Sequence, residues 1–160
     1  NTKMMSKLNK YAADEGLSMP GNLRDQTMHE LGIGTTYKMR SVVKEIFMPV
    51  MKSKAYTWIE KINIWRGKIS SRNYLFNNVL TTDLTNEITS LDIPVYFWSG
   101  IHDYTVNYQL SKDYLNQLDA PTKGFYTFDL SAHSPLFEEP EKALDILIFD
   151  VLQNKTLLAD

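Results

Sequence analysis

The sequence predicts an α/β fold with two regions, a helical region over residues 1–90 and a β-α-β-α unit over residues 91–160. Two observations predict this division. Before Leu91, apolar residues recur at intervals of three and four, as they do on one face of a helix. After Leu91, two short apolar runs rich in aromatic and β-branched residues alternate with helical segments, which is typical of parallel strands.

The helical region reads as several short helices separated by glycine and proline breaks. Apolar faces are formed by Met39, Val42, Val43, Ile46 and Phe47, then by Ile59, Ile62 and Trp65, and then by Leu75, Phe76, Val79 and Leu80. Breaks are expected at Pro20-Gly21, Gly32-Ile33-Gly34, Pro49 and Gly67. We expect Trp58, Trp65 and Tyr74 to pack within this region, the alternative being that they line a substrate pocket.

The β-α-β-α unit begins with an apolar run at 93–98, which is expected to be a strand covered on both faces. A helix is expected over 107–118, and a second strand over 125–130. The buried stripe of that helix is expected to contain Leu110 or Ser111, Tyr114, Leu115 and Leu118.

The last helix is expected to begin at Pro140, because proline suits the first helical position. Acidic residues lie near its positive end, namely Glu138, Glu139 and Glu141. Its buried stripe is expected to contain Leu144, Leu147, Ile148, Val151 and Leu152.

Two parallel strands are too few for a stable sheet, since buried strands need neighbours along their edges. We therefore expect the unit to be the end of a larger sheet, and the chain to associate with itself or with a missing N-terminal half. A small two-stranded domain that is complete in itself is the less favoured interpretation.

Composition narrows the classes of partner. The 160 residues carry a formal net charge of −2 without long runs of either sign, which does not favour a nucleic-acid or anionic-membrane surface. No apolar run approaches the roughly 20 residues that span a bilayer. The absence of cysteine excludes disulfides and thiolate metal sites. We expect a cytoplasmic protein that acts on a small-molecule or peptide substrate without a metal or organic cofactor.

Asp103 and His133 are the candidate catalytic residues, because each follows the end of an expected strand. The carboxylate of Asp103 is expected to accept a hydrogen bond from the imidazole of His133, which would act as a general base. The alternatives are a turn aspartate and a solvated or helix-capping histidine. His102 and His29 are interpreted as solvated or surface residues, since no metal-ligand spacing is present.

A nucleophilic serine is missing from the pattern. A GxSxG elbow needs two glycines four positions apart, and none of the glycines forms such a pair. Neither Ser99 nor Ser134 lies in a tight turn flanked by glycines. The chain therefore carries an acid and a base but not the third member of a Ser-Asp-His triad.

These residues resemble the C-terminal part of the α/β-hydrolases, particularly the bacterial prolyl aminopeptidase-like group. The acid loop of that family has the form Gly-x-x-Asp, matched by Gly100 to Asp103, and its base loop has the form Ala-His-x-Pro, matched by Ala132 to Pro135. The helical part, with Gly21-Asn22-Leu23 and Glu30 to Gly34, looks like the family's lid. The resemblance implies a C-terminal fragment of an α/β-hydrolase fold, in which a helical lid precedes the last strands.

The function implied by the resemblance is that of a serine hydrolase cleaving peptide, amide or ester bonds through an acyl-enzyme. Because the nucleophile is absent, we expect this chain alone to be inactive. Aminopeptidase action would need carboxylates to hold a substrate amine, for which Glu30, Glu45 and Glu60 in the lid are candidates. The alternative is a non-catalytic binding or interaction module on the same fold.

Overall fold

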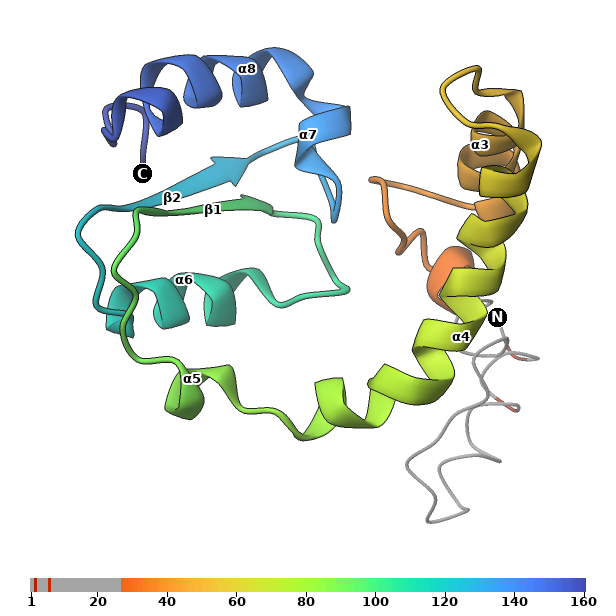
Figure 1. Cartoon of the computed structure of the whole chain (residues 1–160), viewed down its shortest axis with the longest axis horizontal. Helices are drawn as coiled ribbons and strands as arrows, with labels where there is room; N and C mark the ends of the chain where they lie inside the picture. Colours follow the sequence, from red (N-terminus) through yellow and green to blue (C-terminus); the bar gives the residue numbers. More distant parts are fainter. Residues whose placement is uncertain (1, 3–5, 7–26) are drawn as a thin grey trace.

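The structure is a computed structural model that describes residues 27–160 together with residues 2 and 6, and residues 72, 73, 76, 77 and 80 by their backbone alone. The break expected at Pro20-Gly21 and the lid-like Gly21-Asn22-Leu23 lie outside the described residues. Over the described residues the fold is mixed α/β, with helices around a parallel sheet of two strands (Figure 1).

Strand β1 spans Val95–Gly100 and strand β2 spans Lys123–Phe128. The strands pair in parallel, with Val95 beside Lys123 and Gly100 beside Phe128. Their carboxyl ends therefore lie next to each other, so the loops that follow them share one edge of the sheet.

Each strand is displaced by two residues from the expected range. β1 begins two residues later than the expected 93–98, because Pro94 has no N–H to donate to a ladder. β2 begins two residues earlier than the expected 125–130 and ends where Asp129 and Leu130 turn the chain. Composition alone identifies the strands, whereas their ends depend on pairing and turns.

Helices cover both faces of the sheet. Helix α6 (Tyr108–Gln117) lies on one face and helix α8 (Pro140–Phe149) on the other (Figure 1). The α6 face buries Val95, Leu115, Leu118 and Phe125, and the α8 face buries Tyr126, Phe128, Ala143 and Ile146. This arrangement explains why β1 is apolar from Val95 to Trp98 and why β2 contains Phe125, Tyr126 and Phe128.

Helix α6 matches the expected segment closely. The side chain of Asn107 accepts a hydrogen bond from the N–H of Leu110 at 3.0 Å and so caps the helix. Leu115 and Leu118 are buried as expected, but Leu110 is exposed. Ser111 therefore occupies the inner face at the position that the sequence left open between these two residues.

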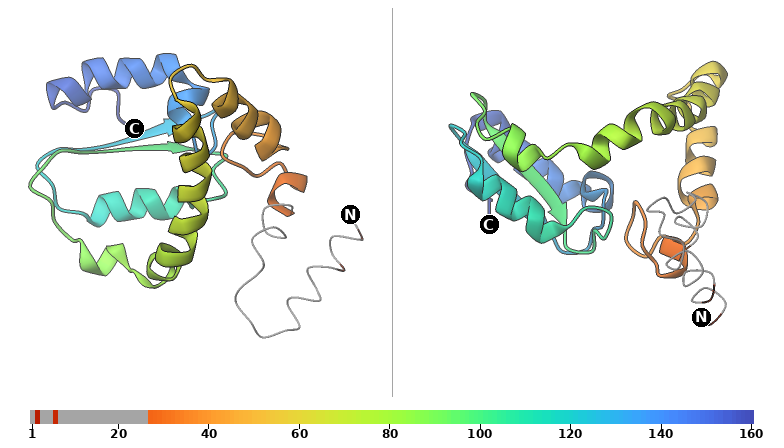
Figure 2. Two further views of the ribbon diagram at one scale, coloured as in Figure 1. Left: turned by 45° about the vertical axis from the view of Figure 1, so that its right-hand side comes forward. Right: turned by 90° about the horizontal axis from the view of Figure 1, so that it is seen from below.

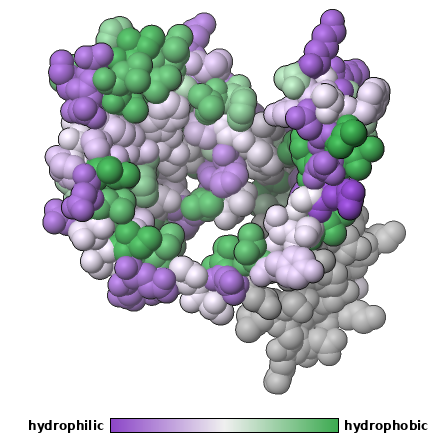
Figure 3. Space-filling view, viewed as in Figure 1, coloured by the Kyte–Doolittle hydropathy of each residue, from purple (hydrophilic) through white to green (hydrophobic). Residues whose placement is uncertain are grey.

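Helix α8 begins at Pro140, as expected, but its buried stripe was wrongly assigned. Ala143, Ile146 and Asp150 are the buried positions, and Val151 packs beside them. The short Ala143 side chain lets the helix approach the aromatic residues of β2 closely. The larger apolar residues lie on the outer face, namely Leu144, Leu147, Ile148 and Leu152. Figure 3 shows an apolar surface over this helix.

The helical region contains the π-helix η1 (Val43–Phe47) and helices α3 (Met48–Lys52), α4 (Trp58–Thr81) and α5 (Leu84–Glu87). Figure 2 shows α3 and α4 standing beside the sheet and its covering helices. No described helix combines the length and the apolar character that crossing a bilayer requires.

The breaks expected at Gly67 and Pro49 are both absent. Helix α4 runs through Gly67 without interruption, because one glycine inside a long helix costs only about 1 kcal/mol. Its start is well defined, since Thr57 and Glu60 form a reciprocal capping box. Pro49 lies in the first turn of α3, where proline is tolerated, and so does not interrupt it.

The apolar faces expected within α4 are largely exposed, whereas Met39, Val42, Ile46 and Phe47 of the preceding face are buried or half-buried. Trp58 and Tyr74 do not pack within the helical region, since their exposed fractions are 69% and 77%. Ile59 and Ile62 are exposed as well, whereas Trp65 is half-buried against Phe47 with ring centroids 5.1 Å apart. The helix itself was predicted correctly, but over the described residues little of the apolar face expected on α4 is covered.

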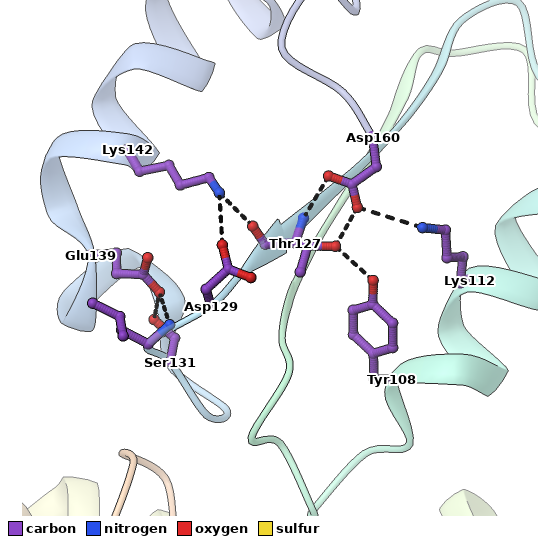
Figure 4. Close-up of polar contacts among 9 residues, drawn as sticks. Tyr108, Lys112, Thr127, Asp129, Ser131, Glu139, Lys142 and Asp160 are labelled. Carbon is purple, nitrogen blue, oxygen red and sulfur yellow. Dashed lines mark hydrogen bonds and ion pairs between the residues drawn. The ribbon is translucent and has the colours of Figure 1, made fainter.

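The C-terminal residues cover one edge of the sheet. The N–H of Asp160 donates to the carbonyl of Phe125 at 2.9 Å, and the Asp160 carboxylate accepts from the hydroxyl of Thr127. The hydroxyls of Thr127 and Tyr108 lie 2.6 Å apart, and Lys112 pairs with Asp160 at 3.5 Å (Figure 4). The edge of β2 away from β1 is thus occupied by the end of the chain.

Asp150 anchors this C-terminal segment from a fully buried position. Its carboxylate accepts hydrogen bonds of 2.8 Å from the Tyr126 hydroxyl and from the N–H groups of Leu157 and Leu158. Burial by itself raises the pKa of Asp150, but these donors more than offset it, so the pKa lies below its ordinary value. Burial, together with the bond to Asp150, raises the pKa of Tyr126.

Replacement of Asp150 by asparagine should lower the free energy of unfolding at pH 7 by about 1–3 kcal/mol, because the amide keeps only one accepting oxygen for three donors. Asp145→Asn, an exposed change on the same helix, should stay within about 0.5 kcal/mol of the parent. Urea denaturation measures both values. Equal stabilities for the two variants would contradict the anchoring role of Asp150.

The same pair of variants tests the pKa of Asp150. A carboxyl whose pKa is lowered on folding stabilises the fold above its unfolded pKa of about 3.9, and this contribution is lost as the pH falls through the folded pKa. The stability gap between the parent and Asp150→Asn should therefore narrow below about pH 4. A difference in stability between the two proteins that widens in acid would contradict a lowered pKa of Asp150.

Candidate functional site

The candidate site lies at the carboxyl ends of β1 and β2, where Asp103 and His133 meet. His133 Nδ1 lies 2.7 Å from Asp103 Oδ2, although the two residues are 30 positions apart in the chain. A carboxylate only accepts hydrogen bonds, so the imidazole donates from Nδ1 and its Nε2 is not used by this contact. The hydrogen bond expected from the sequence is therefore present.

Asp103 is held by its own turn. Its Oδ1 accepts hydrogen bonds from the N–H groups of Thr105 at 2.8 Å and Val106 at 3.0 Å, which leaves Oδ2 for the imidazole. The side chain is only 8% exposed. The two interpretations of Asp103, as a turn residue and as the partner of His133, are thus fulfilled by different oxygens of one carboxylate.

His133 is more accessible, with 44% of its side chain exposed. The N-cap of the short helix α7 (Pro135–Glu138) is Ser134, and no side-chain hydrogen bond caps this helix. The alternative that His133 caps the following helix is therefore wrong. The imidazole is fixed at one nitrogen and partly open to solvent.

Gly100 allows the two loops to approach each other. A Cβ at this position would lie 2.2 Å from the carbonyl oxygen of Ser131 and 2.3 Å from that of Ala132. The N–H of His102 also donates to the Ser131 carbonyl at 3.1 Å, which ties the loop after β1 to the loop before His133. Only a residue without a side chain fits here unless the backbone moves.

Two glutamates brace the loop that carries His133. Glu139 accepts from the N–H of Leu130 at 3.0 Å and from the Ser131 hydroxyl (Figure 4). Glu138 accepts from the N–H of Ala132 at 2.9 Å. None of these bonds goes to the start of α8, but Glu139 is the N-cap residue of that helix and Glu141 lies in its first turn, so these two charges lie at its positive end as expected.

The bracing role of Glu138 and Glu139 was missed by sequence reasoning. Acidic residues just before a helix are common, and the nearest explanation for them is the helix dipole. The sequence did contain a signal for this role. The two glutamates lie a few residues after the loop of Ser131, Ala132 and His133, and the backbone N–H groups of that loop need acceptors when they are buried.

A pocket of about 280 Å³ opens beside the pair, along the edge of β1 that has no strand neighbour among the described residues. Its lining comprises Tyr96, Phe97, Trp98, Ser99, Asp103, Val106, Ser111, Ala132, His133 and Pro135. The hydroxyl of Tyr96, one of these residues, is buried and has no hydrogen-bond partner among the described residues. Ser99 lies within β1 itself and not in a turn, so the structure gives it no elbow geometry.

The other sequence candidates have local roles. His102 stacks on Tyr37 with ring centroids 3.9 Å apart, and His29 is half-buried in a helical turn. Glu45 accepts from the N–H groups of Arg40 and Ser41, and Glu60 completes the cap at Thr57. Glu30 lines a separate open pocket together with His29. None of these contacts joins Asp103 or His133.

Among the described residues, no three histidine or acidic side chains are grouped as a metal site would require. In the part of the chain that the structure describes, the side chains of Asp103 and His133 form hydrogen bonds with each other and within the loop of Asp103. The arrangement can orient an imidazole for proton transfer to and from a nucleophile.

Comparison with known proteins finds one distant relationship to report. A protein of Bacillus subtilis (strain 168) described as the probable aminopeptidase YbaC is 29% identical over 107 residues, which is 67% of this chain. The chain spans about a third of the length of that relative, the matched part being 33% of it. No protein-family model matches the chain. No solved structure matches it.

Proposed function

We propose that this chain is the C-terminal part of a serine hydrolase with an α/β-hydrolase fold, in which residues 1–90 form the lid and residues 91–160 the end of the sheet. The observation that carries the proposal is the 2.7 Å hydrogen bond between Asp103 and His133 at the adjoining ends of parallel strands. The relative described as a probable aminopeptidase supports hydrolysis of a peptide or related bond.

In this proposal Asp103 orients the imidazole and His133 transfers protons. A serine from the preceding part of the protein attacks the carbonyl carbon of the substrate while His133 Nε2 takes its hydroxyl proton. His133 then returns that proton to the leaving amine or alkoxide, and an acyl-enzyme remains. Water, deprotonated by the same nitrogen, releases the acid and restores the serine.

The open edge of β1 supports a missing sheet. The pocket along β1 lies where an earlier strand would run. A strand edge without a partner invites pairing, and the exposed outer face of α8 adds apolar surface to be covered. The preceding part of the protein would cover both, and in its absence the chain would associate with itself.

A fluorophosphonate probe, which labels activated serines, tests the proposal. The full-length protein should be labelled, residues 1–160 alone should not, and adding the separately produced preceding part should restore labelling. His133→Ala in the full-length protein is the control that should abolish it. A full-length protein that neither reacts with the probe nor hydrolyses any ester or peptide would refute the proposed function.

A non-catalytic binding module is the second candidate, favoured by the exposed apolar residues of α4. Trp58, Ile59, Ile69 and Tyr74 are each more than 60% exposed, and such surfaces often mark binding sites. In a pure binder the contact between Asp103 and His133 would be structural. Substitution of His133 then changes stability but no turnover, which separates the two candidates.

A further inference from the structure

A segment of the helical region contacts both loops of the candidate site. The ring of Tyr37 stacks on His102, next to Asp103, with centroids 3.9 Å apart and planes inclined by 12°. The N–H of the same residue donates to Oε1 of Glu138 at 2.5 Å. Tyr37 therefore joins the acid loop through its ring and the base loop through its backbone.

Glu138 connects this segment to the loop of His133. While Oε1 accepts from Tyr37, Oε2 accepts from the N–H of Ala132, the residue before His133. One half-buried carboxylate thus bridges two backbone N–H groups that lie far apart in the sequence. Its neighbour Glu139 accepts hydrogen bonds from Leu130 and Ser131 of the same loop, and neither of these bonds reaches the helical region.

The Tyr37 segment is held in an unusual backbone conformation. Lys38 has φ of 60°, a left-handed value that is uncommon outside glycine, and its Nζ lies 4.6 Å above the Tyr37 ring. Met39 is fully buried, and a Cβ at Gly34 would lie 2.5 Å from its Cβ. The buried Met39 and the strained backbone of Lys38, both directly after Tyr37, fix the direction of the Tyr37 ring and N–H.

We infer that Glu138 is a positioning residue that couples the Tyr37 segment to His133, so that the base reaches its working geometry when this segment is seated on the sheet edge. The inference rests on the proposed function. Glu138 touches neither the substrate nor the reacting atoms in this scheme. It acts through Ala132 and the backbone that leads to the imidazole.

Glutamine at position 138 is the first test, since a carboxamide offers one accepting oxygen and can keep at most one of the two N–H partners. In the full-length protein we expect Glu138→Gln to speed amide hydrogen exchange at Tyr37, Ala132 or both by at least tenfold. The value of kcat should fall by between tenfold and a hundredfold, because misplacement of a reacting group by about 1 Å has effects of this size. KM should change by less than about threefold.

Glu139→Gln is the matched control. It removes the same charge from the neighbouring residue, which braces the same loop. Its expected effect on amide hydrogen exchange is confined to Leu130 and leaves Tyr37 protected. Tyr37→Ala removes the ring that stacks on His102 while Glu138 is unchanged, and this variant should also lower kcat. Effects of Tyr37→Ala and Glu138→Gln should be non-additive, whereas those of Tyr37→Ala and Glu139→Gln should multiply.

Several outcomes would overturn the inference. Unchanged exchange at both Tyr37 and Ala132 would show that the bridge is absent, and multiplicative effects in the first cycle would show that the two residues act independently. If Glu138→Gln fails to fold by circular dichroism, exchange at Ala132 in Tyr37→Ala decides, since an unchanged rate there excludes coupling. Changed exchange without any hydrolysis by the parent protein would preserve the bridge and reject the proposed function instead.

Discussion

Replacement of His133 by alanine in the full-length protein is expected to lower kcat for ester or peptide hydrolysis by about 10⁴- to 10⁶-fold, the range found when a triad histidine is removed. The imidazole is the only described group bonded to the Oδ2 atom of Asp103. KM should change little, because the variant removes an interaction made in the transition state. Steady-state kinetics with a chromogenic ester measure both constants.

Asp103→Asn refines the same prediction. Asparagine keeps an oxygen for the N–H groups of Thr105 and Val106, so the turn should survive. Its NH₂ group would face Nδ1 of His133 and favour the wrong tautomer, for which a loss of about 10⁴-fold in kcat is expected.

His29→Ala is the control for the loss of an imidazole, because His29 has no contact with the pair, and it should leave kcat within about twofold. If His133→Ala retained more than a tenth of the parental kcat, the base would be another residue. The contact with Asp103 would then be a structural feature of the loops, as the binding-module interpretation requires.

Local signals predicted the pairing of Asp103 and His133 because it follows from the order of elements. Parallel strands bring their carboxyl ends together, so two polar residues placed just beyond two strands must lie at one edge. The start of the helix at Pro140 and the approximate range 107–118 of the preceding helix were predictable for the same reason, since each depends on a few neighbouring residues.

The buried faces of the helices and the hydrogen bonds between distant segments were not predictable in this way. In α8 the leucines are more apolar than Ala143, yet Ala143 faces the sheet because close approach to bulky aromatic residues favours a short side chain. Glu138 accepts hydrogen bonds from Tyr37 and Ala132, and no periodicity within a helix reports such partners. Interactions of this kind depend on the packing of whole elements, which a single sequence does not encode locally.

Gly100→Ala is expected to lower the free energy of unfolding by roughly 3 kcal/mol, the upper end of what overpacking costs. The added methyl group would meet the carbonyl oxygens of Ser131 and Ala132 at 2.2 and 2.3 Å, and these are backbone atoms that cannot rotate away. The base loop must therefore move, and His133 with it. A displacement of about 1 Å would lower kcat by about 100-fold even in the fraction that stays folded.

Gly67→Ala is the same chemical change at another glycine, and it is expected to have the opposite effect on the free energy of unfolding. A Cβ at Gly67 meets nothing within 4 Å, and the residue lies inside α4, so alanine should raise the free energy of unfolding by about 0.5–1 kcal/mol. Urea denaturation of both variants, with kcat measured on the folded protein, compares them directly. If both substitutions changed the free energy of unfolding in the same direction, or if Gly100→Ala kept full activity, the close approach of the two loops at Gly100 would not be what places His133 beside Asp103.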